Sequence, residues 1–253
     1  MLMINWGTLL YLLLLLVPLL YLQRILQREI QAIFLLITRQ PEISMALFSL
    51  IFLPGVLLHE VSHFLVAHLL GVRTGRFSII PKKLEGGRIQ LGYVETASSD
   101  FFRDALIGVA PLVTGGIFVA LAGVYRLGLN TIWESLIHGH MSSLNSVLNS
   151  VVDKPDFWLW FYLIFAVSST MMPSSSDRRA WLPLIMVVII LLGLVLLMGV
   201  GPWILSRFGS AFKAAMDAIT MVLGVTVLIH LILLLPAWLI RKMISRIAGL
   251  QVV

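Results

Sequence analysis

The chain has 253 residues, of which 59% are hydrophobic and 12% charged, and its mean hydropathy is +1.00. These values exclude an ordinary soluble domain, in which about a quarter of the residues carry charge. The absence of cysteine excludes a disulfide framework, a thiolate metal site and a cysteine nucleophile. Because the net charge of +6 is carried by so apolar a chain, it favours a lipid bilayer with anionic headgroups as the partner, and no nucleic acid.

A helix that crosses the hydrocarbon core of a membrane needs about 20 apolar residues. Six segments meet this requirement: residues 1–23, 43–70, 105–125, 157–176, 180–206 and 218–240. The first lacks a basic start and a small-residue cleavage site, which favours a retained helix over a signal peptide. The sequence therefore predicts an all-α polytopic membrane protein of about six transmembrane helices, folded as a single membrane domain over residues 1–253.

Two segments differ from this pattern. Residues 23–40 mix charged and apolar side chains, which is typical of an amphipathic helix at the membrane surface. Between the second and third spans, residues 72–97 alternate apolar with polar side chains around Pro81 and the glycine pair 86–87. This alternation predicts a small β-hairpin or sheet.

Lysine and arginine are distributed unequally between the predicted loops. Three segments, residues 71–104, 173–180 and 241–253, carry 11 of the 18 basic residues. With six spans these three segments lie on one side, which the positive-inside rule makes cytoplasmic. We therefore expect a multi-pass protein of a prokaryotic cell membrane with both termini in the cytoplasm, and with segment 23–40 on the opposite side.

The segment with the most distinctive chemistry is His59-Glu60-Val61-Ser62-His63, inside the second span. Histidines four residues apart lie on one face of a helix, where both imidazoles can bind the same metal ion. Zinc lowers the pKa of a bound water to about 7, and Glu60 is adjacent as a general base. Ionisable side chains in a spanning helix are costly and usually functional, which favours a zinc site over a polar cluster between helices or a proton relay.

A catalytic zinc site needs a third protein ligand. Asp177 is the favoured candidate because Pro173 ends the preceding helix in a polar stretch, so the carboxylate can turn into the helix bundle. The alternative is a loop acid that pairs with Arg178 or Arg179.

The remaining histidines and acids are weaker candidates for this site. His138 and His140 form a competing metal pair, but they lie in a loop predicted on the opposite side, as do Asp153 and Asp156. His68 lies on a different face from His63, and we expect it, like His230, to be a hydrogen-bonded helix residue.

The histidine motif in a membrane helix, followed by a β-rich loop, resembles the site-2 protease family of intramembrane zinc metalloproteases. In that family an Asn-x-x-Pro motif leads to Asp-Gly, and its Asp is the third zinc ligand. Residues 170–177 resemble this segment, with Asp177 at the ligand position, and residues 110–114 resemble the Gly-Pro-x-x-Asn of the intervening helix. The resemblance covers about residues 54–181.

Several positions depart from the family pattern. Thr114 and Thr170 replace both Asn residues, and Arg178 replaces the Gly after the ligand. One residue is also missing between Pro173 and Asp177. An amide offers a paired donor and acceptor, which a hydroxyl cannot. No PDZ-type domain fits within the chain, so the resemblance is to a divergent member without one.

The resemblance implies a membrane-embedded metalloendopeptidase that hydrolyses peptide bonds within or near the transmembrane segments of other membrane proteins. One zinc ion would be held by His59, His63 and Asp177, and Glu60 would be the catalytic base. Supporting or substrate-binding roles fall to Thr114, Thr170 and Pro173. The alternative is a non-proteolytic membrane protein, either a pseudoprotease or a metal or proton transporter, that uses the same histidines.

These expectations divide the chain into three parts. Residues 1–42 hold the first span and the amphipathic helix, 43–181 the catalytic core with its β-loop at 72–97, and 182–253 two C-terminal spans and a basic tail. His63 lies eight residues, or ~12 Å, from the end of its helix at Gly71. The active site is therefore predicted inside the bilayer and nearer its cytoplasmic face, where the β-loop could hold an unwound substrate.

Overall fold

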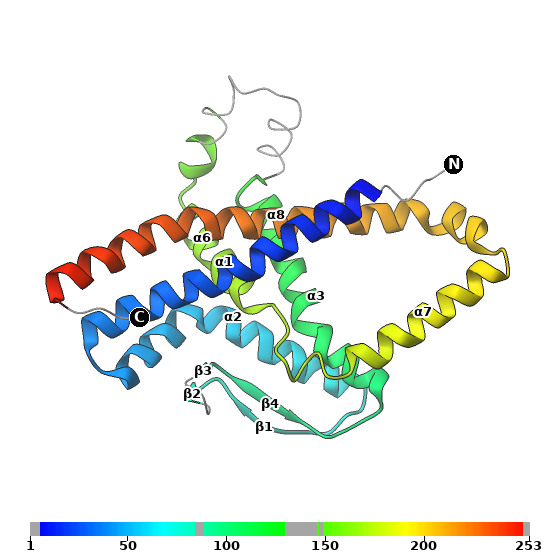
Figure 1. Cartoon of the computed structure of the whole chain (residues 1–253), viewed down its shortest axis with the longest axis horizontal. Helices are drawn as coiled ribbons and strands as arrows, with labels where there is room; N and C mark the ends of the chain where they lie inside the picture. The colour runs from blue at the N-terminus through cyan, green and yellow to red at the C-terminus, as the bar shows by residue number, and fades with distance from the viewer. Residues whose placement is uncertain (1–5, 84–88, 130–145, 147–148, 250–253) are drawn as a thin grey trace.

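The computed structural model describes residues 6–83, 89–129, 146 and 149–249, and most of these are helical (Figure 1). The helices are α1 (Trp6–Thr38), α2 (Pro41–Leu69), α3 (Phe101–Tyr125), α6 (Phe157–Thr170), α7 (Trp181–Leu197) and α8 (Gly201–Ala248). Four short strands lie between α2 and α3: β1 (Thr74–Ser78), β2 (Lys82–Lys83), β3 (Ile89–Gln90) and β4 (Tyr93–Thr96).

Three helical segments are long and apolar enough to cross a membrane, namely Pro41–Leu69, Phe101–Tyr125 and Ser206–Ala248. Two further apolar helices, Phe157–Thr170 and Trp181–Val195, are shorter than a typical span. The chain therefore has the helices of a membrane protein. Of the six predicted spans, the second, third and sixth are confirmed as helices of spanning length, and the others stay predictions.

Helix α1 joins two elements that the sequence analysis separates. The predicted span 1–23 and the predicted surface helix 23–40 form one continuous helix from Trp6 to Thr38, with residues 1–5 outside the described part. The predicted boundary at Gln23 is wrong because no glycine or proline follows until Pro41, so nothing breaks the backbone there. The helix ends instead at Thr38, and the next residue, Arg39, has a φ of 53° that turns the chain into α2.

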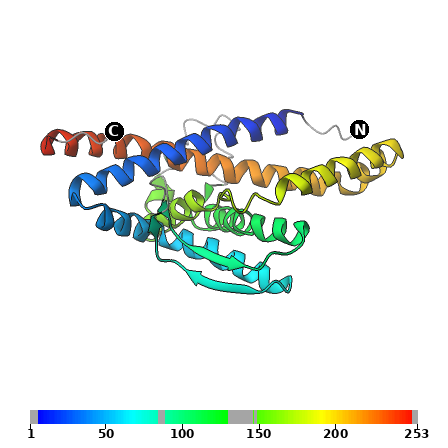
Figure 2. The same cartoon turned by 60° about the horizontal axis from the view of Figure 1, so that its bottom comes forward.

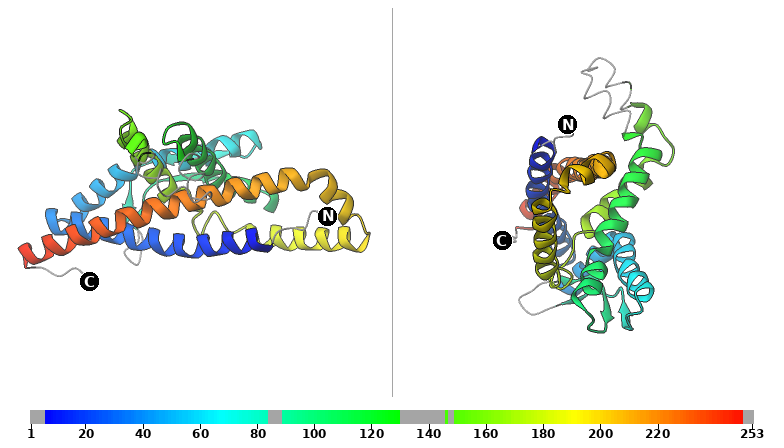
Figure 3. Two further views of the ribbon diagram at one scale, coloured as in Figure 1. Left: turned by 90° about the horizontal axis from the view of Figure 1, so that it is seen from above. Right: turned by 90° about the vertical axis from the view of Figure 1, so that its right-hand side faces the viewer.

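Helices α1 and α8 lie side by side and run in the same direction (Figures 1 and 3). Arg241 of α8 forms an ion pair with Glu29 of α1. The sequence analysis placed these two segments on opposite sides of the membrane, and this contact shows that they lie at the same end. The side of the membrane on which each segment lies stays a prediction.

Helices α2, α3 and α6 form the core around the candidate site. Glycines let them approach closely, as small residues do between membrane helices. A Cβ at Gly55 of α2 would lie 2.3 Å from the carbonyl oxygen of Ala166 in α6, and one at Gly115 of α3 would lie 2.5 Å from the Cβ of Met171. The end of α6 is therefore fixed closely between α2 and α3.

The β insertion lies along α2 (Figure 2). Strand β1 pairs antiparallel with β4, and β2 pairs antiparallel with β3, which confirms the predicted small sheet between the second and third spans. The glycine pair 86–87 is outside the described residues. Gly92, between β3 and β4, packs directly on α2, since a Cβ there would lie 2.9 Å from side-chain atoms of both Val56 and Glu60.

Candidate metal centre

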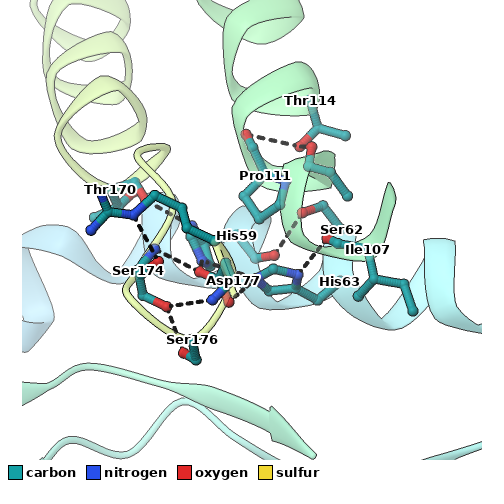
Figure 4. A network of polar contacts seen from close by, with 12 residues as sticks. His59, Ser62, His63, Ile107, Pro111, Thr114, Thr170, Ser174, Ser176 and Asp177 are labelled. Atoms are coloured by element: carbon teal, nitrogen blue, oxygen red, sulfur yellow. Dashed lines mark hydrogen bonds and ion pairs between the residues drawn. The ribbon is translucent and has the colours of Figure 1, made fainter. Parts of the chain in front are cut away.

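Three of the predicted site residues converge at the centre of the fold (Figure 4). The Nε2 atoms of His59 and His63 lie 3.1 Å apart. The carboxylate oxygens of Asp177 lie 3.8 Å from Nε2 of His59 and 3.5 Å from Nε2 of His63. One ligand atom from each residue falls within 4.8 Å of the other two, so this group could hold a metal ion.

Asp177 reaches the histidines from the turn that follows α6. Its carboxylate accepts a hydrogen bond of 2.7 Å from the backbone N–H of Ser174. The turn leans on α3 at Gly108, where a Cβ would lie 2.1 Å from the carbonyl oxygen of Asp177. Arg178 is exposed and donates from Nε to the carbonyl oxygen of Ser174, so the Asp177 carboxylate faces the histidines instead of this arginine.

The environment of Asp177 keeps its carboxyl ionised. Burial acts to raise its pKa, but contacts with His59, His63 and Ser174 outweigh burial and hold the pKa below its ordinary value. A carboxylate must be deprotonated to bind a metal ion. Asp177 is therefore already in the state that a ligand requires.

His63 is oriented by a backbone carbonyl that a proline leaves free. Its Nδ1 lies 2.8 Å from the carbonyl oxygen of Ile107 in α3. In an α-helix that oxygen would accept from the N–H of residue 111, but Pro111 has no N–H. The Nδ1–H of His63 therefore supplies the missing donor, and its Nε2 points toward Asp177.

His59 is oriented in the same way by the end of a helix. Its Nδ1 lies 2.7 Å from the carbonyl oxygen of Thr170, the last residue of α6. The last carbonyls of a helix have no donor within it. If α6 continued, the N–H of Ser174 would donate to the Thr170 carbonyl, but it donates to the Asp177 carboxylate instead.

These two contacts determine what the site can bind. A carbonyl oxygen only accepts, so Nδ1 of each ring carries a proton, and a ring that is neutral presents the lone pair of its Nε2 to a cation. Two such lone pairs 3.1 Å apart repel one another unless a proton or a cation lies between them. Two imidazole nitrogens and a carboxylate, with both Nδ1–H groups bonded to carbonyls, fit a divalent metal such as zinc.

Glu60 is buried beside the two histidines but does not belong to the group that could share an ion. Among the residues that the structure describes, none donates a hydrogen bond to its carboxylate. Gly92 of the β insertion packs against its side chain. The carboxylate is therefore near the metal group and available to accept a proton.

The predicted supporting residues divide into two cases. The hydroxyl of Thr114 donates to the carbonyl oxygens of Ala110 and Pro111 in its own helix, and that of Thr170 donates to Ala166 and Val167. Neither hydroxyl bonds to a ligand side chain within the described residues. Thr170 instead accepts from His59 through its backbone carbonyl. Pro173 has no N–H, so it cannot donate to the carbonyl of Ser169, four residues earlier.

The other candidates lie away from this group. His230 is buried, donates from Nδ1 to the carbonyl oxygen of Thr226 and contacts the Ser169 hydroxyl through Nε2, which confirms it as a hydrogen-bonded helix residue. His68 is exposed and stacks on Phe64.

The acids near α6 also have other partners or none of the ligands beside them. Asp156 accepts from the Trp160 indole and lies 3.9 Å from Arg126. Asp153 is exposed at the start of the turn before α6. The predicted pair at residues 138 and 140 lies outside the described residues.

Sequence reasoning missed the groups that hold the ligands in place. Pro111 inside a spanning helix is a signal for a free carbonyl at Ile107, since the partner of that carbonyl is always four residues on. Gln23 and Gln27, two amides four residues apart at the start of the mixed polar and apolar segment 23–40, are a second signal. Comparison with family models, curated proteins and solved structures finds no match to this chain. Function is therefore argued from the site.

Proposed function

We propose that this protein is an intramembrane zinc metalloprotease similar to the site-2 protease family. The observation that carries the proposal is the convergence of His59 and His63, with Glu60 beside them, from α2, a helix of membrane-spanning length, and of Asp177 from the turn after α6. Substrates would be membrane proteins cleaved within or near a transmembrane segment.

The residues of the site have distinct roles in this proposal. His59, His63 and Asp177 would hold the zinc ion, which would supply a Lewis acid that polarises a carbonyl and makes a water more acidic. Glu60 takes a proton from the attacking water and delivers it to the leaving amine, so hydrolysis yields a carboxylate and an amine. The carbonyls of Ile107 and Thr170 keep both imidazoles in one orientation throughout.

Hydrolysis in a membrane requires water at the site, and the turn after α6 supports its entry. Ser174 and Ser176 are exposed there and are hydrogen-bonded to one another at 2.7 Å. The side chains of His59 and Asp177 keep 13% and 15% of their surface accessible. Polar groups therefore extend from the surface of this turn to the ligands.

The β insertion supports a place for the substrate backbone. A helical substrate hides its carbonyls in internal hydrogen bonds and must unwind before attack. An unwound segment can add as a strand to a sheet edge. Because Gly92 lies against Glu60, a segment extended along β3 and β4 would run beside the proposed base.

The test compares Glu60→Gln with Glu42→Gln, an exposed glutamate on the first turn of the same helix. The full-length variants would be reconstituted in vesicles with a panel of membrane-spanning reporters, and cleavage and bound zinc measured together. We expect Glu60→Gln to lower cleavage at least about 10²-fold with zinc unchanged, and Glu42→Gln to resemble the wild type. Zinc-loaded wild type that cleaves nothing would favour the non-proteolytic alternative.

A further inference from the structure

The C-terminal end of α6 carries three consecutive carbonyls that accept hydrogen bonds from side chains of other helices. Gln23 Nε2 of α1 donates to Ser168 at 2.8 Å, and Gln27 Nε2 of α1 donates to Ser169 at 3.1 Å. The third carbonyl, of Thr170, accepts from His59 at 2.7 Å. The same helix end thus meets both α1 and the metal group.

The carbonyls of Ser169 and Thr170 need outside donors because their partners along the helix do not supply them. Pro173 has no N–H to reach Ser169, and the N–H of Ser174 is directed to Asp177 instead of Thr170. Ser168 and Ser169 are 0% and 5% exposed, so bulk water does not replace such donors there. An amide NH₂ from a neighbouring helix is one of the few groups that can.

The two glutamines are placed for this purpose. They lie four residues apart on one face of α1, and Gln23 is only 5% exposed. A buried amide in an apolar helix is costly unless it is hydrogen-bonded. Both side-chain amides donate to carbonyl oxygens of α6. Within the described residues, no second acceptor competes for these N–H groups.

We propose that Gln23 and Gln27 are positioning residues of the metal centre. They hold the end of α6 so that the Thr170 carbonyl keeps the ring proton of His59 on Nδ1, and so that the turn to Asp177 starts from a fixed point. This inference rests on the proposed function only in that the site binds a metal. It makes α1, which lies outside the segment that resembles the protease family, a part of the site.

Helix α8 holds the same end of α6 from another direction. The hydroxyl of Ser169 lies 3.0 Å from Nε2 of His230, whose Nδ1 donates to Thr226 one turn away. Because this contact holds a side chain and not the carbonyls of α6, it cannot replace the glutamines. It does keep α6 in place when they are removed, so the variants below are expected to fold.

The test uses cobalt(II) as a coloured probe of the full-length protein in detergent. Leucine replaces each glutamine in Gln23→Leu/Gln27→Leu, because it is of similar size and forms helices well. The control is Gln31→Leu, one turn further along the same face, where the backbone carbonyl accepts from Ser44 and the side chain makes no hydrogen bond within the described residues. We expect the double variant to raise the cobalt dissociation constant about tenfold and to alter the visible spectrum, while Gln31→Leu changes neither.

A rescue variant separates donation of a proton from helix packing. Gln27→Lys keeps a donor that can reach a C-terminal carbonyl, and Gln27 is only half-buried, so its charge can stay near water. It should bind cobalt as the wild type does, whereas Gln27→Leu should bind more weakly. Equal weakening by lysine and leucine would overturn the proposal. This pair also decides the question if the double variant does not fold.

A second measurement needs no metal. Nitrogen-15 spectra of the histidine rings in metal-free protein should show a proton on Nδ1 of His59 in the wild type, and loss of that proton from Nδ1 in part of the double-variant molecules. A double variant with unchanged tautomer, cobalt affinity and spectrum would show that the glutamines only stabilise the fold. None of these measurements depends on cleavage of a reporter. The role of the glutamines would therefore be tested even if the protein proved not to be a protease.

Discussion

The Nδ1 of His63 lies 2.8 Å from the carbonyl oxygen of Ile107, and the oxygen is free because Pro111 stands four residues later. A proline that weakens one helix thereby orients a ligand on another. The cost of the missing helical bond is offset by a bond from an imidazole that needs an acceptor. If α3 were a regular helix, the Ile107 carbonyl would already accept from the N–H of residue 111. The His63 ring would then lack this acceptor and could turn either way.

Pro111→Ala tests this relationship. Alanine restores an N–H at position 111, which competes with His63 for the Ile107 carbonyl, and it favours the helix by about 3 kcal/mol over proline. We expect zinc affinity, measured by competition with a chelator, to fall about 10- to 100-fold. Pro236→Ala in α8, an exposed proline inside a helix far from the ligands, should leave affinity unchanged. Normal zinc binding by Pro111→Ala would show that the ring needs no carbonyl.

Gly108→Ala tests the support of the turn after α6. The added Cβ would lie 2.1 Å from the backbone carbonyl oxygen of Asp177, a contact that forces the turn to move. We expect zinc affinity to fall at least about tenfold as the carboxylate moves away from the histidines. Gly116→Ala is the matched control in the same helix, since nothing lies within 4 Å of its Cβ. Equal affinities in the two variants would mean that the turn adapts without loss.

Asp177→Asn tests the third ligand directly. A neutral amide oxygen is a poorer donor to a cation than a carboxylate, so zinc affinity should fall by more than the 10- to 100-fold that outer groups contribute. Asp153→Asn and Asp156→Asn should each keep a full equivalent of zinc, measured on protein purified in parallel. A full equivalent in Asp177→Asn, with loss in either of the others, would move the third ligand to the loop before α6.

The site illustrates which features a sequence can reveal. The spacing of His59 and His63 predicts a shared ligand because helical periodicity alone places them together. The turn expected after Pro173 predicts that the Asp177 carboxylate can point into the helix bundle. The carbonyl of Ile107 carries no side-chain signal, and its partner depends on how α2 meets α3, which a single sequence does not encode locally.

The orientation of the outer helices could not be predicted for a similar reason. Rules based on loop charge treat each span as independent, whereas Glu29 and Arg241 pair across two helices separated by most of the chain. Opposite charges on membrane helices are stabilised when they meet. The ion pair is therefore a contact between distant residues that loop charges do not indicate.

This pairing leads to the last prediction, which concerns topology. Because α1 and α8 run in the same direction, the chain near residue 40 and the chain near residue 247 should lie on one side of the membrane (Figure 1). The protein has no cysteine, so single cysteines can be labelled without background. Gln40→Cys and Ile247→Cys, both at exposed positions, should react with a membrane-impermeant maleimide from the same side of sealed vesicles.

A cross-link tests the same arrangement at the contact itself. Glu29→Cys/Arg241→Cys should be joined by a short bis-maleimide cross-linker, because the two long native side chains meet at their ends and leave a gap of that size between two cysteines. Glu29→Cys/Lys213→Cys should not, because Lys213 lies 28 residues earlier in α8, about 42 Å along the helix. Labelling from opposite sides, together with no cross-link between positions 29 and 241, would restore the arrangement of six alternating spans. A cross-link with labelling from one side would place the basic stretch of α1 and the basic tail against the same lipid headgroups.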